Sequence, residues 1–254
     1  MKRSHWSIPY VVFMAVFVVL PLLLVMLYAF QDGSGHFTLA NITRFFSDSD
    51  ALSTFAVSLE VAIENTLICI LLGYPAAWIL ANKELNRSAV TIILFIMPMW
   101  INALMRTLAT AEIFNMLGIP LGKGTLLFGM VYDYLPFMIY PIYNVLSKMD
   151  KSYQEAAQDL GATPWKVFWK VTVPLSIPGV SSGVLMVFMP TVSTFAISEF
   201  LTNNKIKIFG TIIQENINSS MWNYGAALAF LMLIIIGITT LFDKDKEQLE
   251  GGLI

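Results

Sequence analysis

Six stretches of the sequence are apolar over about the length that a helix needs to cross a bilayer, and this pattern leaves few folds open to the chain. A transmembrane helix requires about 20 mostly apolar residues. Of the 254 residues, 57% are hydrophobic and only 13% are charged, whereas about 25% are charged in an average soluble domain. We therefore predict an all-α membrane protein in which residues 1–254 form a single transmembrane domain with six transmembrane helices. The predicted spans are 9–30, 61–82, 89–106, 125–147, 177–199 and 225–242.

The distribution of basic residues predicts how these spans are oriented. Cytoplasmic loops of membrane proteins carry an excess of Lys and Arg. If the N-terminus lies inside, the inner segments hold ten such residues and the outer segments hold five, so both termini are predicted to be cytoplasmic. The inner residues are Lys2, Arg3, Lys83, Arg87, Lys148, Lys151, Lys166, Lys170, Lys244 and Lys246, and the outer ones are Arg44, Arg106, Lys123, Lys205 and Lys207.

The polar segment 151–174 joins the fourth and fifth predicted spans and has the local chemistry of two short helices that meet at a tight corner. Ser152 and Glu155 form an S-x-x-E capping box, which predicts a first helix that begins at Tyr153. Gly161 can adopt the left-handed backbone conformation that ends a helix. The segment is therefore predicted to form a helical elbow on the cytoplasmic side of the membrane.

The second helix of the elbow has its own start and stop signals. Thr163 is placed to cap a helix whose first residue is Pro164, a position where the missing N–H of proline has no consequence. Pro174 is predicted to end this helix, because proline removes a helical hydrogen bond and clashes with the preceding turn.

The elbow resembles the EAA loop of the permease subunits of ABC importers. The residues that carry the resemblance are Glu155, Ala156, Ala157 and Gly161, followed after nine residues by Val171, Val173 and Pro174. Valine stands where the family pattern has isoleucine and leucine. The resemblance implies a type I permease fold in a bacterial plasma membrane, with a cytoplasmic coupling helix that docks into an ATPase subunit. It also implies three partners in addition to the lipid membrane: a dimer of ATP-binding subunits, a second homologous permease and an extracytoplasmic solute-binding protein.

The sequence contains none of the enzyme signatures that such a chain could carry. It has no G-x-x-x-x-G-K-[ST] phosphate-binding loop, so the chain is not predicted to hydrolyse ATP itself. His5 and His36 have no partner at a spacing that suits a metal ion. The serines within the spans have no histidine beside them to act as a base. We predict no catalytic residue, no metal site and no cofactor, and nucleic acid is not among the expected partners.

Three carboxylates lie within or at the ends of the predicted spans. Acidic residues in a membrane are energetically unfavourable and usually have a functional or a structural partner. Glu64 begins the second span, Asp133 lies near the middle of the fourth, and Glu199 lies toward the outer end of the fifth. None has a basic residue near it in the sequence. Carboxylates that faced one cavity would attract a cationic substrate, although satisfaction by neighbouring helices is an open alternative, especially for Glu64 and Glu199.

Prolines and aromatic residues mark the same spans. Prolines within spans predict broken helices, which are tolerated where the backbone lines a cavity or is buried in protein. Pro136 and Pro141 follow Tyr132 and Tyr134 closely, and aromatic faces can hold an alkylammonium by cation–π contact. The predicted substrate pathway consists of Asp133, Tyr132, Tyr134, Trp100, Asn102, Glu64 and Glu199.

Further motifs resemble one subfamily of these permeases, the spermidine/putrescine importers. They are Asn65-Thr66, Gly73-Tyr74-Pro75-Ala76-Ala77, Met97-Pro98-Met99-Trp100, Arg106-Thr107, Tyr134-Leu135-Pro136-Phe137-Met138, Pro178-Gly179 and Phe209-Gly210-x-x-Ile213. This resemblance implies transport of polyamines by alternating access. Permeases for iron, thiamine or sulfate share parts of the pattern and remain open as alternatives. An ion-coupled secondary transporter would use the carboxylates for coupling, but the elbow argues against it.

Overall fold

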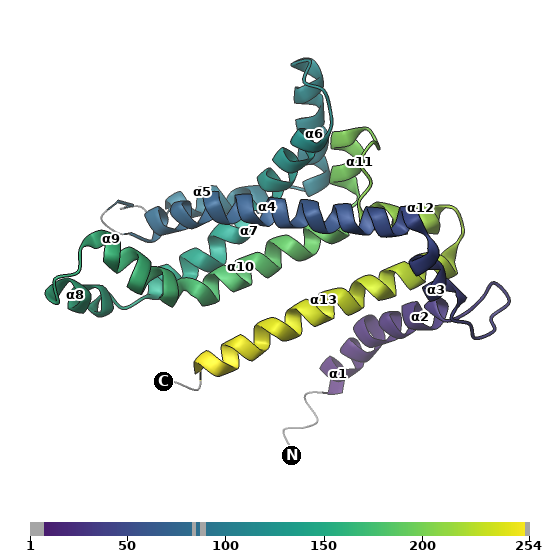
Figure 1. Cartoon of the computed structure of the whole chain (residues 1–254), viewed down its shortest axis with the longest axis horizontal. Coiled ribbons are helices and arrows are strands. Elements are labelled where there is room, and N and C mark those ends of the chain that lie inside the picture. Colours follow the sequence, from purple (N-terminus) through teal and green to yellow (C-terminus); the bar gives the residue numbers. More distant parts are fainter. Residues whose placement is uncertain (1–7, 83–84, 87–89, 252–254) are drawn as a thin grey trace.

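The computed structural model describes residues 8–82, 85–86 and 90–251, and every regular element in these ranges is a helix (Figure 1). The elements are α1 Ile8–Met14, η2 Ala15–Val19, α2 Leu20–Ala29, α3 Ala40–Ser47, α4 Ser49–Ala81, α5 Val90–Ile96, η3 Met97–Trp100, α6 Ala103–Met116, α7 Lys123–Lys148, α8 Ser152–Asp159, α9 Pro164–Val167, η4 Phe168–Thr172, α10 Val173–Ser193, α11 Ala196–Thr202, α12 Phe209–Asn218 and α13 Trp222–Gly251. Of the charges that predicted the orientation, Lys2, Arg3, Lys83 and Arg87 lie outside the described residues.

Helices α4, α7 and α10 pack against one another and form the centre of the molecule. Small residues allow their backbones to approach closely, as is usual between helices in a membrane. Met138 of α7 is fully buried between Gly73 of α4 and Gly183 of α10, where an added Cβ would lie 2.9 Å and 2.7 Å from its side chain. Asn65 of α4 donates a hydrogen bond to the Thr191 hydroxyl of α10 at 2.8 Å. The three helices therefore form one tightly packed unit.

A second group of helices lies beside this unit. Helix α13 packs along α2, and α12 and α3 contact α13 at one end of the molecule (Figure 1). Phe209 at the start of α12 is fully buried and meets the rings of Phe45 and Phe55 edge-on. The elbow of α8 and α9 lies at the opposite end, toward which α13 runs.

The third predicted span, 89–106, is not a straight helix. The chain turns by 89° between Val90–Trp100 and Ala103–Met116, so α6 projects from the bundle beside α11. The Asn102 side chain accepts hydrogen bonds from the backbone N–H groups of Leu104, at 2.9 Å, and Met105, at 3.3 Å, and so begins a new helix. The third predicted span thus covers one helix, a bend and the first residues of a second helix.

The other prolines do not break their helices, contrary to the prediction. Helices α4, α7 and α10 continue through Pro75, through Pro136 and Pro141, and through Pro178 and Pro190. Each proline removes one hydrogen bond, and packing against neighbouring helices maintains the rest.

Four described helices are long and apolar enough to cross a membrane: Pro9–Ala29, Ser49–Ala81, Lys123–Lys148 and Pro164–Ser193. The bent pair Val90–Trp100 and Ala103–Met116 adds a fifth candidate if it forms one span, and Trp222–Gly237 is a shorter apolar helix. The all-helical membrane fold is confirmed, and the count of six spans stays a prediction.

Candidate coupling elbow and substrate pathway

A residue just before the first helix of the elbow, which was not singled out from the sequence, binds the start of that helix. Helix α8 begins at Ser152, and the Asp150 carboxylate accepts a hydrogen bond from the Ser152 backbone N–H at 2.9 Å. The predicted capping box is wrong. The N-cap residue is Lys151, whose side chain makes no cap hydrogen bond, and Ser152 is already within the helix. The backbone hydrogen bond from Ser152, followed by the bond from its side chain, lowers the pKa of Asp150. The ionised form of the carboxylate is thereby favoured at the start of the helix, where negative charge is stabilising.

The corner of the elbow forms as predicted. Gly161 has a φ of +82°, in the left-handed region. Its N–H donates to the Gln158 carbonyl at 2.8 Å, and the Ala162 N–H donates to the Ala157 carbonyl at 3.0 Å. These two bonds constitute a Schellman motif, which satisfies carbonyls that the end of α8 would otherwise leave free.

The second helix starts at Pro164, as predicted, but it does not end at Pro174. Although Thr163 occupies the cap position, its side chain makes no cap hydrogen bond. From Pro164 the chain continues as one helix to Ser193. Just before the proline, the Val173 N–H bonds to the Phe168 carbonyl five residues back. This π-helical turn accommodates the proline, since π-turns can be inserted into α-helices. The second helix of the elbow is therefore the direct extension of a membrane-length helix.

Aromatic contacts join the elbow to a second membrane helix. The Phe168 ring meets Tyr74 and Trp78 of α4 edge-on, with centroid distances of 5.9 Å and 5.6 Å. The Tyr74 hydroxyl lies 2.8 Å from the Ser176 hydroxyl of α10. A displacement of the elbow would therefore act on α10 directly and on α4 through these contacts.

The outer surface of the elbow is open. Glu155, Ala156 and Gly161 are exposed, Ala157 is half-buried, and Leu160 at the corner is 90% exposed. On the inner side, a cavity of about 510 Å³ separates the elbow from the ends of α4 and α7.

Asp133, the deepest of the predicted pathway carboxylates, has a counter-charge. Its Oδ1 lies 3.1 Å from Nη2 of Arg106, and the exposed fractions of the two side chains are 2% and 6%. Arg106, which was assigned to the outer segments from the sequence, is thus buried in α6 against α7 and paired with a carboxylate. The guanidinium carbon lies 5.4 Å from the centroid of the half-exposed Tyr132 ring.

The remaining predicted pathway residues lie in different surroundings. Tyr134 points the other way from Tyr132, with its hydroxyl 3.5 Å from the Pro190 carbonyl of α10. Trp100 is 87% exposed at the bend between α5 and α6. Asn102 caps α6. Asp133, Tyr132 and the bend thus belong to the same part of the molecule, and Tyr134 contacts α10.

The other two carboxylates do not share the Asp133 ion pair. The Lys123 ammonium lies 2.8 Å from Glu64 Oε1 and 2.6 Å from Glu60 Oε1, one turn earlier on α4. Glu199 lies in the first turn of α11, half-buried. No contact of the described residues places the three carboxylates around one cavity.

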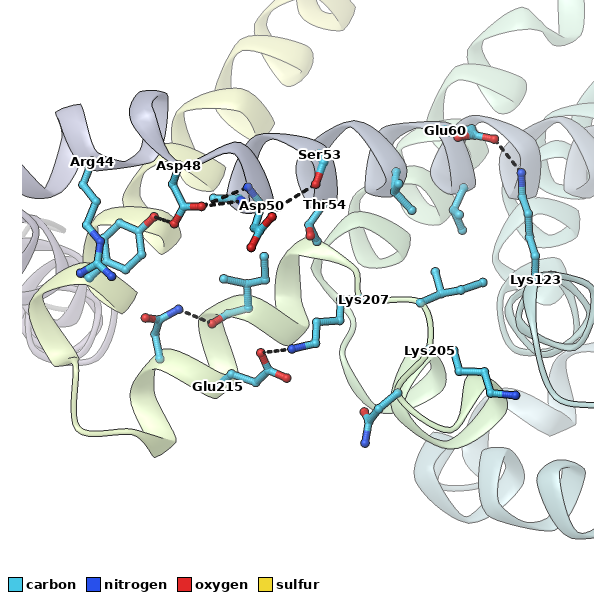
Figure 2. A pocket seen from close by; sticks show the side chains of 18 residues that line it. Arg44, Asp48, Asp50, Ser53, Thr54, Glu60, Lys123, Lys205, Lys207 and Glu215 are labelled. Atoms are coloured by element: carbon cyan, nitrogen blue, oxygen red, sulfur yellow. Dashed lines mark hydrogen bonds and ion pairs between the residues drawn. The ribbon is translucent and has the colours of Figure 1, made fainter.

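A polar cavity of about 750 Å³ opens at the end of the molecule opposite the elbow (Figure 2). Figure 2 shows Lys207 paired with Glu215 on one wall and Lys123 reaching toward Glu60 on another. The charged lining residues are Arg44, Lys123, Lys205, Lys207, Asp48, Asp50, Glu60 and Glu215, so positive and negative side chains are equal in number.

Sequence reasoning missed Arg106 and Lys123 as partners of the carboxylates. Arg106 lies 27 positions before Asp133, and Lys123 lies 59 positions after Glu64. The signal that could have found Arg106 is that an acidic residue at membrane depth needs a counter-charge, and Arg106-Thr107 had been recognised as a motif.

Curated relatives of known transport systems resemble this chain over most of its length. It is 33% identical over 223 residues to the spermidine/putrescine transport system permease protein PotB of Escherichia coli, covering 81% of each chain. It is 30% identical over 246 residues to PotB of Haemophilus influenzae, covering 87% of this chain and 86% of the relative. The spermidine/putrescine permease protein PotC of Shigella flexneri is 25% identical over 221 residues.

Solved structures share the fold. A chain of a bacterial ABC transporter that imports the acidic polysaccharide alginate superposes with a TM-score of 0.70 at 17% identity, covering 96% of this chain and 98% of the other. A family described as "Binding-protein-dependent transport system inner membrane component" matches residues 5–244. The elbow, the helical fold and this match agree: the chain belongs to that family, the membrane-embedded permease components of ABC importers.

Proposed function

We propose that this permease imports polyamines of the spermidine and putrescine type. The observation that carries the proposal is the 33% identity, over 81% of both chains, to a spermidine/putrescine permease. Two further features agree with a cationic cargo. Asp133 places a carboxylate deep in α7, and Tyr132 presents a half-exposed aromatic face beside it. Protonated amines are recognised by carboxylates and by aromatic faces.

The proposed complex contains this chain, a second homologous permease and a dimer of ATP-binding subunits. An extracytoplasmic solute-binding protein delivers the cargo, as in the related alginate importer, which has been crystallised in complex with a periplasmic protein that carries an alginate pentasaccharide. In this arrangement the chain itself is not an enzyme, and it lies in the bacterial inner membrane with both termini in the cytoplasm.

The elbow is proposed to couple ATP hydrolysis to transport. Glu155, Ala156, Ala157 and Gly161 form the surface that the ATPase subunit contacts, and Pro174 lies at the junction with α10. Because the helix from Pro164 to Ser193 is continuous, a push on α8 has to pass only the tight corner at Gly161 before it reaches a membrane helix. Phe168 and Tyr74 pass the same push to α4. Alternating access then follows from rocking of the bundle.

The proposed cargo path runs along the bend between α5 and α6 and along α7. Asp133, Tyr132, Trp100 and Asn102 lie along this part of the molecule, and Tyr134 supports α7 from the side of α10. The candidate pathway residues nearer the outer face are Glu64 and Glu199.

Uptake measurements test the cargo. The complete complex, reconstituted in vesicles with the binding protein outside and ATP inside, is expected to accumulate radiolabelled spermidine or putrescine. Unlabelled polyamine should compete, whereas thiamine, ferric iron and sulfate should not. Accumulation of one of those three solutes, without polyamine uptake, would refute the polyamine assignment and leave the family assignment intact.

Thiol labelling tests the orientation. Cysteines introduced at Asn218 and at the exposed Trp165, each in a Cys69→Ala background, should react differently with an impermeant maleimide applied to intact cells. The positive-inside distribution predicts labelling at position 218 and protection at position 165 until the cells are permeabilised. Reaction at position 165 in intact cells would reverse the proposed topology.

A further inference from the structure

The ion pair between Arg106 and Asp133 has a geometry that suits exchange better than permanent attachment. We propose that Arg106 is an internal counter-ion, which holds Asp133 while the pathway is empty and is displaced from it by a protonated amine of the cargo. The inference rests on the proposed function, because it takes the cargo to be a cation. It makes Arg106 a specificity-determining residue.

The pair is incompletely formed. Only Nη2 of Arg106 approaches Asp133, at 3.1 Å, whereas strong arginine–carboxylate pairs form two parallel hydrogen bonds. Nε and Nη1 of Arg106 are buried and have no hydrogen-bond partner among the described residues, and Asp133 Oδ1 accepts no hydrogen bond of good geometry. Buried polar groups in a settled structure are almost always satisfied. The guanidinium is therefore attracted to the carboxylate without being fixed to it.

The second oxygen of Asp133 is also held weakly. Thr107 Oγ1 lies 3.3 Å from Asp133 Oδ2 and 2.9 Å from the Ala103 carbonyl of its own helix. A hydroxyl has one hydrogen to donate, and the shorter contact with Ala103 competes for it. Asp133 thus retains unused acceptor capacity on both oxygens, which a primary ammonium with three N–H donors can use.

The Tyr132 ring can hold the guanidinium after it is displaced from Asp133. Its ring lies 5.4 Å from the guanidinium carbon, within the range of a cation–π contact. A small movement of Arg106 toward this ring would free the carboxylate without moving the arginine charge into lipid.

The exchange also accounts for selectivity. Removing the Arg106 charge from Asp133 leaves a buried carboxylate that has to take up a proton or pair with another cation. A cationic cargo supplies that partner directly, whereas a neutral or anionic solute does not. Because the pair joins α6 to α7 beside the 89° bend, the exchange would also loosen the contact between these helices as the cargo passes.

A double substitution separates a role of the ion pair in cargo binding from a purely structural role. The variant Arg106→Gln with Asp133→Asn replaces both charges with amides that can hydrogen-bond to each other, so the complex should assemble in normal amount. If Asp133 binds cargo, this variant should take up spermidine at a rate lower by about tenfold or more. As a control, Glu112→Gln removes an exposed carboxylate from α6, the helix that carries Arg106. This variant should take up spermidine at the wild-type rate.

The single variants complete the comparison. Asp133→Asn should lower uptake as the double variant does, whereas Arg106→Lys keeps the exchangeable charge and should retain most of the uptake. Wild-type uptake by the double variant would overturn the inference while leaving the polyamine proposal intact. Absence of polyamine uptake by the wild-type complex would overturn both.

Discussion

Replacement of Gly161 by valine is expected to abolish most ATP-driven uptake while the protein remains assembled in the membrane. With a φ of +82°, Gly161 is in the left-handed region, where an ordinary residue is strained by about 1–2 kcal/mol and a branched one is a clear outlier. No heavy atom lies within 4 Å of the position that a Cβ would occupy. The strain therefore acts on the angle between α8 and α9 and not on packing, so the elbow would no longer present the proposed coupling surface correctly. We expect transport to fall by about tenfold or more, since 1.4 kcal/mol corresponds to a factor of ten.

The chain contains a matched control for this substitution. Gly118 ends α6 with a φ of +68° and the same two Schellman hydrogen bonds, from Gly118 to Asn115 at 3.1 Å and from Ile119 to Phe114 at 2.9 Å, again in open space. Gly118→Val carries the same strain outside the elbow and should transport nearly normally. Gly161→Asn should retain most activity, because asparagine tolerates the left-handed conformation. Full uptake by a well-assembled Gly161→Val complex would contradict the coupling role.

Substitution of Gly210 by alanine is expected to prevent the protein from accumulating in a folded form. A Cβ at this position would lie 2.2 Å from the Ser193 carbonyl oxygen and 2.6 Å from that of Thr194. Both atoms belong to the backbone, so the clash cannot be relieved by a change of rotamer. Helix α12 would have to move away from the end of α10, which would separate the buried Phe209 from its aromatic neighbours. Overpacking of this kind destabilises by about 1–3 kcal/mol or more.

The amount and thermal stability of detergent-purified protein measure this effect. Gly124→Ala is the control, because its added methyl group would meet no heavy atom within 4 Å, and it should behave as the wild type does. A Gly210→Ala protein with unchanged yield and unchanged midpoint of thermal unfolding would show that the contact between α12 and α10 is looser than the structure indicates.

The features that the sequence predicted correctly are those that depend on neighbouring residues. The start of the second elbow helix at Pro164 and the left-handed corner at Gly161 follow from the backbone preferences of proline and glycine, which act within one turn of helix. The apolar segments likewise follow from composition along a short window.

The sequence signals for helix ends gave wrong predictions where two residues a few positions apart could both begin a helix, or where packing outweighed a stop signal. Asp150 and Ser152 are both good cap residues, and the sequence does not decide between them, but the turn after Met149 places Asp150 at the helix start. Pro174 is a strong signal for the end of a helix. The helix nevertheless continues past it, because a π-turn precedes the proline and the following helix is packed against its neighbours. The bend at Asn102 could not be predicted from hydropathy, because an apolar stretch has the same hydropathy whether its helix is straight or bent.

The counter-charges were decided by the tertiary structure alone. Arg106 and Lys123 find Asp133 and Glu64 only because α6, α7 and α4 are packed side by side. An ion pair depends on distance in space, and nothing in the spacing of 27 or 59 residues along the chain encodes that distance. The sequence by itself therefore determined a helical membrane protein with a two-helix elbow, whereas the partners of its buried charges, and so the chemistry of its proposed pathway, were set by how the helices pack.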